Sequence, residues 1–217
     1  MITLTDYGVK LVQLTEDKIE LVRQWRNSDK IKKYMEYRDY ITPEMQQKWF
    51  DKISNTTNDF FFIIIENNKE VGLVNIKNVE WSKRIGEWGV FVWDDLCLHN
   101  GTAYKAALCL YDFAFNVLHL DNIEAHIINN NIRSIKYHER LGYKLLDNQI
   151  EVSDKEVNQL YILTKEFYIK QKSVVMDKIN KMKSITPPLP GFRMGLDQSL
   201  AIEKLTIHEF SYNSLAA

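Results

Sequence analysis

Alternating and continuous apolar runs in the first half of the chain predict β-strands. Apolar and polar residues alternate over 9–14, as in a strand with one buried face. Two β-rich runs, at 59–66 and 70–78, are joined by Asn67-Asn68-Lys69, which is a strong hairpin signal. A further run at 87–93 is dense in aromatic and β-branched residues. We therefore expect four strands here, the last three of them consecutive.

Apolar residues at helical spacing predict helices around these strands. Ile19, Val22 and Trp25 form one stripe, and Thr15 before them is a candidate N-cap. Thr42-Pro43-Glu44 predicts a second helix start, because proline fits the first helical position. With the second half of the chain, the order is a mixed α/β pattern that contains one strand–helix–strand crossover. The elements expected in that half are helices at 102–118 and 132–141 and strands at 122–128, 143–146 and 159–164.

The pattern changes toward the C-terminus, so we expect a domain of residues 1–168 followed by an appendage of residues 169–217. Residues 174–182 have a helical pattern, the proline-rich run 187–191 interrupts regular structure, and 199–205 predicts another short helix. We expect this tail to dock on the domain, to mediate oligomerisation such as homodimer formation, or to be partly disordered.

Composition is that of an ordinary soluble globular protein, with 45% hydrophobic and 26% charged residues. The longest clean apolar run, 60–65, is far shorter than the roughly 20 residues of a membrane-spanning helix. The net charge of −1 argues against a broad surface for nucleic acid or anionic membranes. Cys97 and Cys109 match no zinc or redox spacing, so no metal is expected. Few cysteines and no N-terminal signal sequence favour the cytoplasm.

A glycine turn before the helix at 102–118 is a candidate anion site. A helix start presents unpaired backbone N–H groups and the positive end of the helix dipole. Gly101 has no side chain where an anion would approach, and Ala103 is nearly as small. A glycine before a helix is also an ordinary turn residue, so this element alone leaves both interpretations open.

Two stretches together resemble the GNAT N-acetyltransferase superfamily. The first, 98–103, resembles the signature Gln/Arg-x-x-Gly-x-Gly/Ala; Gly101 and Ala103 match it, and Leu98 departs from the usual Gln or Arg. The second, 131–143, resembles the pattern Asn-x-x-Ser-Ile-x-x-Tyr-Glu-x-x-Gly-Phe almost position for position. An amphipathic helix that ends at a glycine would explain part of the second stretch but not the whole pattern.

This resemblance implies a GNAT fold of the α/β (α+β) class, with a mixed, mostly antiparallel sheet, splayed central strands and flanking helices. It implies acetyl transfer from acetyl-CoA, a co-substrate used without a metal, to a small-molecule amine in a ternary complex. The pyrophosphate of coenzyme A would bind backbone N–H groups of the turn, and the pantetheine arm would lie along a free strand edge. The residues expected at the cofactor are Phe91, Val92, Trp93, Leu98, Asn100, Gly101, Thr102, Ala103, Asn131 and Ser134.

Three residues are candidates for proton transfer. His138 aligns with the family's tyrosine that protonates the leaving thiolate, and imidazole can donate a proton near neutral pH. Tyr137 is the alternative donor or a core residue, because neighbours on a helix point about 100° apart and only one of them faces the sulfur. Glu87 lies on a strand where many family members carry a glutamate, so it is either the base or an exposed strand acid.

The triplet Trp25-Arg26-Asn27 indicates the acceptor. It resembles N-acetyltransferases that act on nucleotide-linked amino sugars, notably those of pseudaminic acid biosynthesis. An aromatic face, a cation and an amide suit the base, phosphates and hydroxyl groups of such a molecule. Trp25 also fits the apolar stripe of its helix. The aromatic residues expected to line the same pocket are Tyr34, Tyr37, Tyr40 and Trp81.

Two other functions stay open. Protein N-terminal and polyamine acetyltransferases share both signatures, and a polyamine would favour an acidic pocket, for which Glu36, Asp39 and Glu44 give modest support. A non-catalytic GNAT domain that binds acyl-CoA is the second alternative, and the departures at Leu98 and His138 are in its favour.

Overall fold

The centre of the fold is one mixed sheet, in a computed structural model that describes residues 1–153 and 156–185. Its strands are β1 (Thr3–Asp6), β2 (Val9–Gln13), β3 (Phe60–Glu66), β4 (Lys69–Glu80), β5 (Ile85–Val92), β6 (Asn122–Ile128), β7 (Lys144–Ser153) and β8 (Glu156–Thr164). They have the order β1-β2-β3-β4-β5-β6-β8-β7. Every neighbouring pair is antiparallel except β5 and β6, which are parallel.

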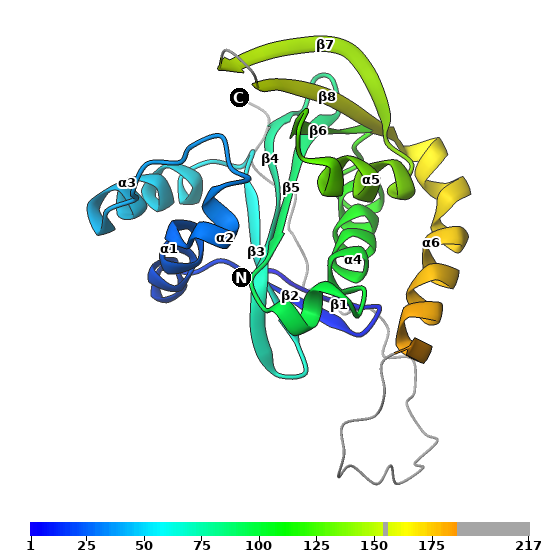
Figure 1. Cartoon of the computed structure of the whole chain (residues 1–217), viewed down its shortest axis with the longest axis horizontal. Coiled ribbons are helices and arrows are strands. Elements are labelled where there is room, and N and C mark those ends of the chain that lie inside the picture. The colour runs from blue at the N-terminus through cyan, green and yellow to red at the C-terminus, as the bar shows by residue number, and fades with distance from the viewer. Residues whose placement is uncertain (154–155, 186–217) are drawn as a thin grey trace, which may run out of the picture. The chain divides into compact units, whose positions relative to one another are not determined.

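Helices cover both faces of this sheet (Figure 1). They are η1 (Glu16–Lys18), α1 (Ile19–Asn27), α2 (Asp29–Lys32), α3 (Pro43–Ser54), η2 (Asp95–Leu98), α4 (Thr102–Asn116), α5 (Ile132–Leu141) and α6 (Lys165–Ile185). α1, α2 and α3 lie on one face, and α4, α5 and α6 lie on the other. A small apolar core therefore forms under α1 and α3, and a larger one forms around α4.

Short-range signals account for several of these elements. Asn67 and Asn68 have φ angles of 52° and 60°, as a two-residue turn between β3 and β4 requires. Thr42 caps α3 by accepting a hydrogen bond from the Met45 N–H at 3.2 Å, and Pro43 occupies the first helical position. The predicted hairpin and the predicted helix start are confirmed.

The second half of the chain follows the predicted order. The strand 122–128 and the helix 132–141 have the predicted bounds, and Gly142 ends the helix with a φ of 101°. The predicted helix 102–118 ends earlier, at Asn116. β7 and β8 extend beyond their predicted bounds, because they lengthen by pairing with each other, and no local pattern encodes that pairing.

The parallel pair β5 and β6 separates along its length. The pairing comprises Ile85 with Asn122, Gly86 with Ile123 and Glu87 with Glu124. Beyond it, β5 stays paired with β4 as far as Val92, and β6 stays paired with β8 as far as Ile128. A gap therefore opens between two halves of the sheet, and the predicted splay of the central strands is confirmed.

One strand is absent from the predicted set. β1 pairs with β2 through a turn at Tyr7 and Gly8, whose φ angles are 54° and 79°. Of the four residues in β1, only Leu4 is buried. So short a strand shows too little alternation of apolar and polar residues for a sequence pattern to reveal it.

α6 crosses the expected boundary at residue 168. It begins directly after β8 and packs against α4 and α5, with Val175 and Ile179 buried in the larger core. The Tyr168 hydroxyl donates to a carboxylate oxygen of Asp112 on α4 at 2.8 Å. The helical pattern at 174–182 is therefore part of a longer helix that docks on the domain.

The described residues belong to one compact unit that extends to Thr186. The proline-rich run 187–191 and the helix expected at 199–205 lie outside the described residues. No helix among the described residues is long and apolar enough to cross a membrane.

Candidate active site

A cleft of about 960 Å³ lies where β5 and β6 separate. On the face covered by α1 it is lined by Arg26, Asn75, Lys77 and Glu87, together with aromatic and aliphatic residues. We call this part the α1 side of the cleft. The α4 side is lined by the first residues of α4 and by one face of α5, including Gly101, Ala103, Asn131 and Ser134. The cleft thus connects the two faces of the sheet.

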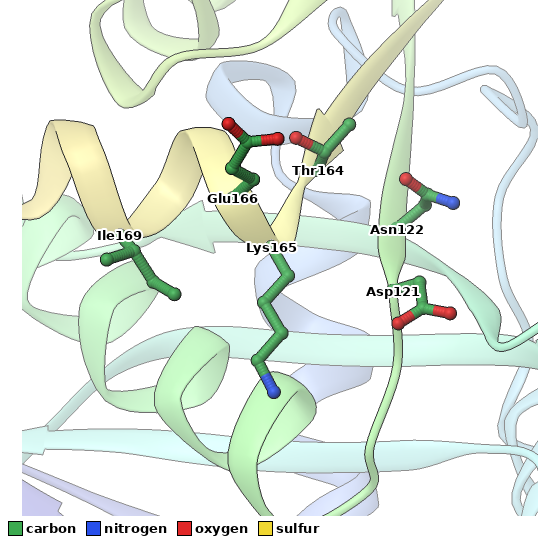
Figure 2. Close-up of a pocket in the computed structure, with 6 residues that line it drawn as sticks. All are labelled: Asp121, Asn122, Thr164, Lys165, Glu166 and Ile169. Carbon is green, nitrogen blue, oxygen red and sulfur yellow. The ribbon is translucent and has the colours of Figure 1, made fainter.

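A second depression, of about 520 Å³, lies at the opposite end of β6 (Figure 2). The Lys165 side chain there points away from Glu166, and its Nζ donates to the Phe115 carbonyl at 2.8 Å. This depression contains none of the residues expected at the site, so the cleft between β5 and β6 is the candidate active site. The residues that line the second depression are Asp121, Asn122, Thr164, Lys165, Glu166 and Ile169.

The turn before α4 has the geometry of an anion site. Gly101 is the N-cap of α4 with a φ of 84°, and both Gly101 and Ala103 line the cleft. The Thr102 N–H donates to Asn100 Oδ1 at 3.1 Å. In the part of the chain that the structure describes, the N–H groups of Ala103 and Tyr104 have no hydrogen-bond acceptor. Two donors at the positive end of a 15-residue helix therefore face the cleft.

A buried polar cluster holds this turn in place. Glu66, at the end of β3, accepts hydrogen bonds from Lys105, Thr102 and Asn100. The ion pair between Glu66 and Lys105 is almost fully buried, with 4% and 6% of the side chains exposed. Burial alone would raise the pKa of Glu66, but the bonds from Lys105 and its neighbours outweigh that effect and hold the pKa below its usual value.

This cluster changes the expectation for two residues. Asn100 and Thr102 do not line the cleft, because their side chains turn toward Glu66. Glu66 and Lys105 themselves were not among the residues expected from the sequence. The signal for them was a charge within an apolar pattern: Glu66 ends the run 60–65, and Lys105 interrupts the buried stripe of α4.

His138 is buried on α5 and lines the cleft. Its Nδ1 lies 2.8 Å from the Ser134 carbonyl oxygen, so Nδ1 carries the ring proton and donates it there. The rings of Tyr137 and Tyr143 pack edge-on against it at 5.1 and 5.0 Å. Burial lowers the pKa of His138 to about 4, although the bond to Ser134 opposes that shift. Near pH 7 the ring is neutral and Nε2 has no proton, which disfavours the expected role as acid.

Tyr137, the alternative donor, also lines the cleft. Its hydroxyl donates to the Ala103 carbonyl at 2.8 Å, and its ring packs on Tyr104 at 4.9 Å. Burial raises the pKa of Tyr137 well above its usual value, so the phenol is protonated at neutral pH. The Tyr137 hydroxyl therefore carries a proton, and its hydrogen bond to Ala103 links α5 to the start of α4.

Glu87 faces the α1 side of the cleft. One carboxylate oxygen accepts from Lys77 Nζ at 2.7 Å and the other accepts from Asn78 Nδ2 at 2.8 Å. The side chain is 20% exposed. A role as base would therefore require an acceptor amine to compete with these two partners.

The remaining residues expected at the cofactor fall into two groups. Phe91, Val92 and Leu98 line the cleft. Trp93 does not: its N–H donates to the Val71 carbonyl at 2.7 Å, and its ring is covered by Lys30 Nζ at 3.9 Å. Asn131 Oδ1 caps α5 by accepting from the Ser134 N–H at 3.1 Å. Both Asn131 and Ser134 line the cleft.

The structure separates the members of the Trp25-Arg26-Asn27 triplet. Trp25 is 4% exposed, contacts Phe91 edge-on at 6.2 Å and does not line the cleft, as the core alternative expects. Asn27 exchanges two hydrogen bonds with the backbone of Ile41, at 2.9 and 2.8 Å. Of the triplet, only Arg26 lines the cleft.

Of the aromatic residues expected at the acceptor, some line the cleft and others do not. Tyr34 and Tyr37 line the cleft, and Tyr40 does not. Trp81 lies outside it as well, with its Nε1–H donating to Asn58 Oδ1 at 2.8 Å and its ring against Phe60. Among the described residues, no group of three or more His, Cys, Asp or Glu side chains is arranged to hold a metal ion.

Comparison with known proteins agrees with this geometry. The family model of the "Acetyltransferase (GNAT) domain" matches residues 9–144. The chain is similar to Acetyltransferase PseH of Campylobacter jejuni, with 20% identity over 158 residues that cover 73% of this chain and 92% of that protein.

Two solved structures share the fold. Spermidine N-acetyltransferase from Vibrio cholerae, in complex with CoA and spermine, has a TM-score of 0.68 at 15% identity, covering 76% of this chain and 99% of that one. A putative acetyltransferase from T. thermophilus has a TM-score of 0.67 at 15% identity, covering 82% and 97%. Because the family model matches more than half of its length, the chain belongs to the GNAT acetyltransferase family and is an N-acetyltransferase.

Proposed function

We propose that the chain transfers an acetyl group from acetyl-CoA to the primary amine of a nucleotide-linked amino sugar. The observation that carries this proposal is Arg26. Its guanidinium lines the α1 side of the cleft and has no ion pair or hydrogen bond among the described residues. Burial lowers the pKa of Arg26, yet a guanidinium remains charged at every physiological pH. A partly buried cation without a partner is best satisfied by an anion such as a phosphate.

The other charges on the α1 side favour an anionic acceptor over a polyamine. Each acid there has a partner: Asn158 for Glu36, Lys77 for Glu87 and Lys30 for Asp95. Lys33, like Arg26, has no acidic side-chain partner in the described part of the chain, and its Nζ lies 4.8 Å from the centroid of the Tyr34 ring. A polycation would meet unpaired cations, whereas a nucleotide diphosphate would neutralise them.

The similarity to PseH supports the same acceptor class. The Trp-Arg-Asn triplet resembles acetyltransferases of pseudaminic acid biosynthesis, and PseH is a relative over most of the chain. The spermidine acetyltransferase has the same fold at 15% identity, which is too distant to argue for a shared acceptor. The predicted homodimer stays a prediction.

We assign the α4 side of the cleft to acetyl-CoA. The N–H groups of Ala103 and Tyr104, which have no acceptor among the described residues, suit the pyrophosphate, and Gly101 lines the cleft beside them. The edge of β5 beyond Glu87 can accept the pantetheine amides as an added strand. When bound, acetyl-CoA supplies the thioester whose acyl carbon the amine attacks. Tyr137 or water would protonate the leaving sulfur, since neutral His138 has no proton on Nε2, and the proton that the attacking amine loses would pass to water or return to Tyr137.

Replacing Gly101 by alanine tests the cofactor assignment. Both Gly101 and Gly8 have a left-handed φ, 84° and 79°, so Gly101→Ala and the control Gly8→Ala should each lose about 1 kcal/mol of stability. Only at Gly101 would the new Cβ meet other atoms, Met182 Sδ at 3.4 Å and Ile179 at 3.8 Å on α6, so only there would it press on the turn that lines the cleft. We expect acetyl-CoA to bind Gly101→Ala about tenfold more weakly by isothermal titration. Equal affinity in the two variants would contradict the assignment.

Replacing Arg26 by alanine tests the acceptor. In a thiol-release assay, we expect the KM for a UDP-linked amino sugar to rise about 10- to 100-fold, because a charged hydrogen bond is lost. The affinity for acetyl-CoA should not change. Lys32→Ala removes a nearby cation that does not line the cleft, and it serves as the control. The proposal fails if spermidine or a peptide N-terminus is acetylated more efficiently than the nucleotide sugar, or if Arg26→Ala leaves its KM unchanged.

A further inference from the structure

Asn75 is a polar side chain in an otherwise apolar stretch of β4, on the α1 side of the cleft. Its neighbours on the strand, Val74 and Ile76, point into the larger core, and Leu73 packs into the smaller one. The side-chain oxygen Oδ1 is buried and has no hydrogen-bond donor among the described residues. A buried acceptor without a donor costs free energy in the unliganded protein.

The strand next to Asn75 is shaped to accommodate this amide. Asn75 lies opposite Gly89 in the β4–β5 pairing. A Cβ built on Gly89 would lie 2.9 Å from Asn75 Nδ2 and 3.1 Å from Oδ1, which is closer than such atoms pack. The carboxamide therefore leans from β4 over the backbone of β5, in the place where any other residue would have its side chain.

This position is next to the gap in the sheet. The pairing of β5 with β6 ends at Glu87, two positions before Gly89 along the strand, so the far edge of β5 at Gly89 borders the cleft. On the same face, Leu73 and Phe91 form an apolar wall on one side of the amide. The Lys77–Glu87 ion pair lies on its other side. Asn75 is thus a neutral polar group between them.

We propose that the Asn75 carboxamide, whose buried Oδ1 has no donor in the unliganded protein, turns toward the cleft when the acceptor binds, so that Oδ1 accepts a hydrogen bond from the attacking amine and directs the nitrogen lone pair toward the thioester carbon. The inference rests on the proposed function only in requiring an amine acceptor; it does not depend on which amine. A neutral carboxamide suits this task, because a carboxylate would stabilise the protonated ammonium, which has no lone pair for attack.

The first test replaces Asn75 by leucine, which has a similar shape and no acceptor atom. With the amine that the wild-type enzyme acetylates fastest, among a UDP-linked amino sugar, spermidine and a peptide, we expect kcat/KM to fall about tenfold. The affinity for acetyl-CoA should stay the same. The melting temperature should stay the same or rise, because the orphan acceptor is removed. Asn116→Leu, at the exposed end of α4, is the matched control.

The second test replaces Asn75 by aspartate, which keeps the oxygen but adds a charge. We expect the acidic limb of the pH profile of kcat to move up by about one unit, because kcat reports the groups of the enzyme–substrate complex and the carboxylate raises the pKa of the bound amine. A purely structural side chain would not move this limb.

Three results would overturn the proposal: kcat/KM of Asn75→Leu within twofold of wild type, an unshifted profile for Asn75→Asp, or a melting temperature of Asn75→Leu below that of Asn116→Leu. The comparison of melting temperatures can be made without any acceptor amine. If the fastest amine is not the nucleotide sugar, the proposed function fails while Asn75 is tested on that amine in the same way.

Discussion

Replacing Lys105 by methionine is expected to lower the free energy of unfolding by about 3–5 kcal/mol, because Glu66 is then left as a buried charge without a counterion. Thr102 and Asn100 would still donate hydrogen bonds to Glu66, but neither carries a charge. The loss should appear in urea denaturation at pH 7 as a lower midpoint with an unchanged slope. The same variant should weaken acetyl-CoA binding, since this cluster holds the turn before α4.

Two variants show whether the effect comes from a buried charge. The double variant Glu66→Leu with Lys105→Met removes both charges, and it should recover much of the lost stability. Lys83→Met breaks an exposed pair with Glu80, whose side chains are 70% and 48% exposed, and it should cost less than about 1 kcal/mol. A Lys105→Met variant as stable as Lys83→Met would contradict the importance of the cluster.

Lowering the pH from about 7 to about 4 is expected to remove about 3 kcal/mol of stability through His138 alone. The pKa of this ring is about 4 in the folded protein and 6.5 in an ordinary environment, because burial disfavours the charged form. Between these values the unfolded chain binds a proton that the folded chain does not. The stability is therefore fully present above about pH 6.5 and is lost as the pH falls through the folded pKa.

Urea denaturation at a series of pH values measures this effect. His138→Phe should flatten the pH dependence between about 6.5 and 4, since phenylalanine fills the space between Tyr137 and Tyr143 and does not titrate. If the stability of that variant fell with pH as steeply as that of wild type, His138 would not be the group responsible. Turnover of His138→Phe at pH 7.5 should stay close to that of wild type; a loss of about 100-fold or more would restore His138 as the general acid.

Most secondary structure was predictable from the sequence, because its signals act between neighbours in the chain. The Asn67–Asn68 turn, the Thr42 cap and the Gly142 stop each depend on one residue's own conformational preference or hydrogen bond. β1 escaped prediction because it is held by its pairing with β2 and buries only Leu4. The extension of the compact unit beyond the expected boundary at residue 168 could not be found locally either, since α6 belongs to the domain through contacts with α4 and α5.

The sequence signal for the lining of the cleft was strong where backbone geometry has a local signature. Gly101 at the start of α4 and Asn131 at the start of α5 are recognisable because a glycine turn and a side-chain cap have local signatures. It was weaker where adjacent side chains point different ways. Trp25 is buried and Arg26 lines the cleft, although they are neighbours on one helix.

The sequence by itself thus determined the family, the order of most elements and the glycine turn before α4. Tertiary structure alone decided the chemistry of the side chains. His138 is neutral because it is buried against the rings of Tyr137 and Tyr143, Glu66 is charged because Lys105 reaches it from another element, and Asn75 lies over Gly89 because β4 pairs with β5 in that register. Burial and pairing join residues far apart in the chain, and no local pattern encodes which of them will meet.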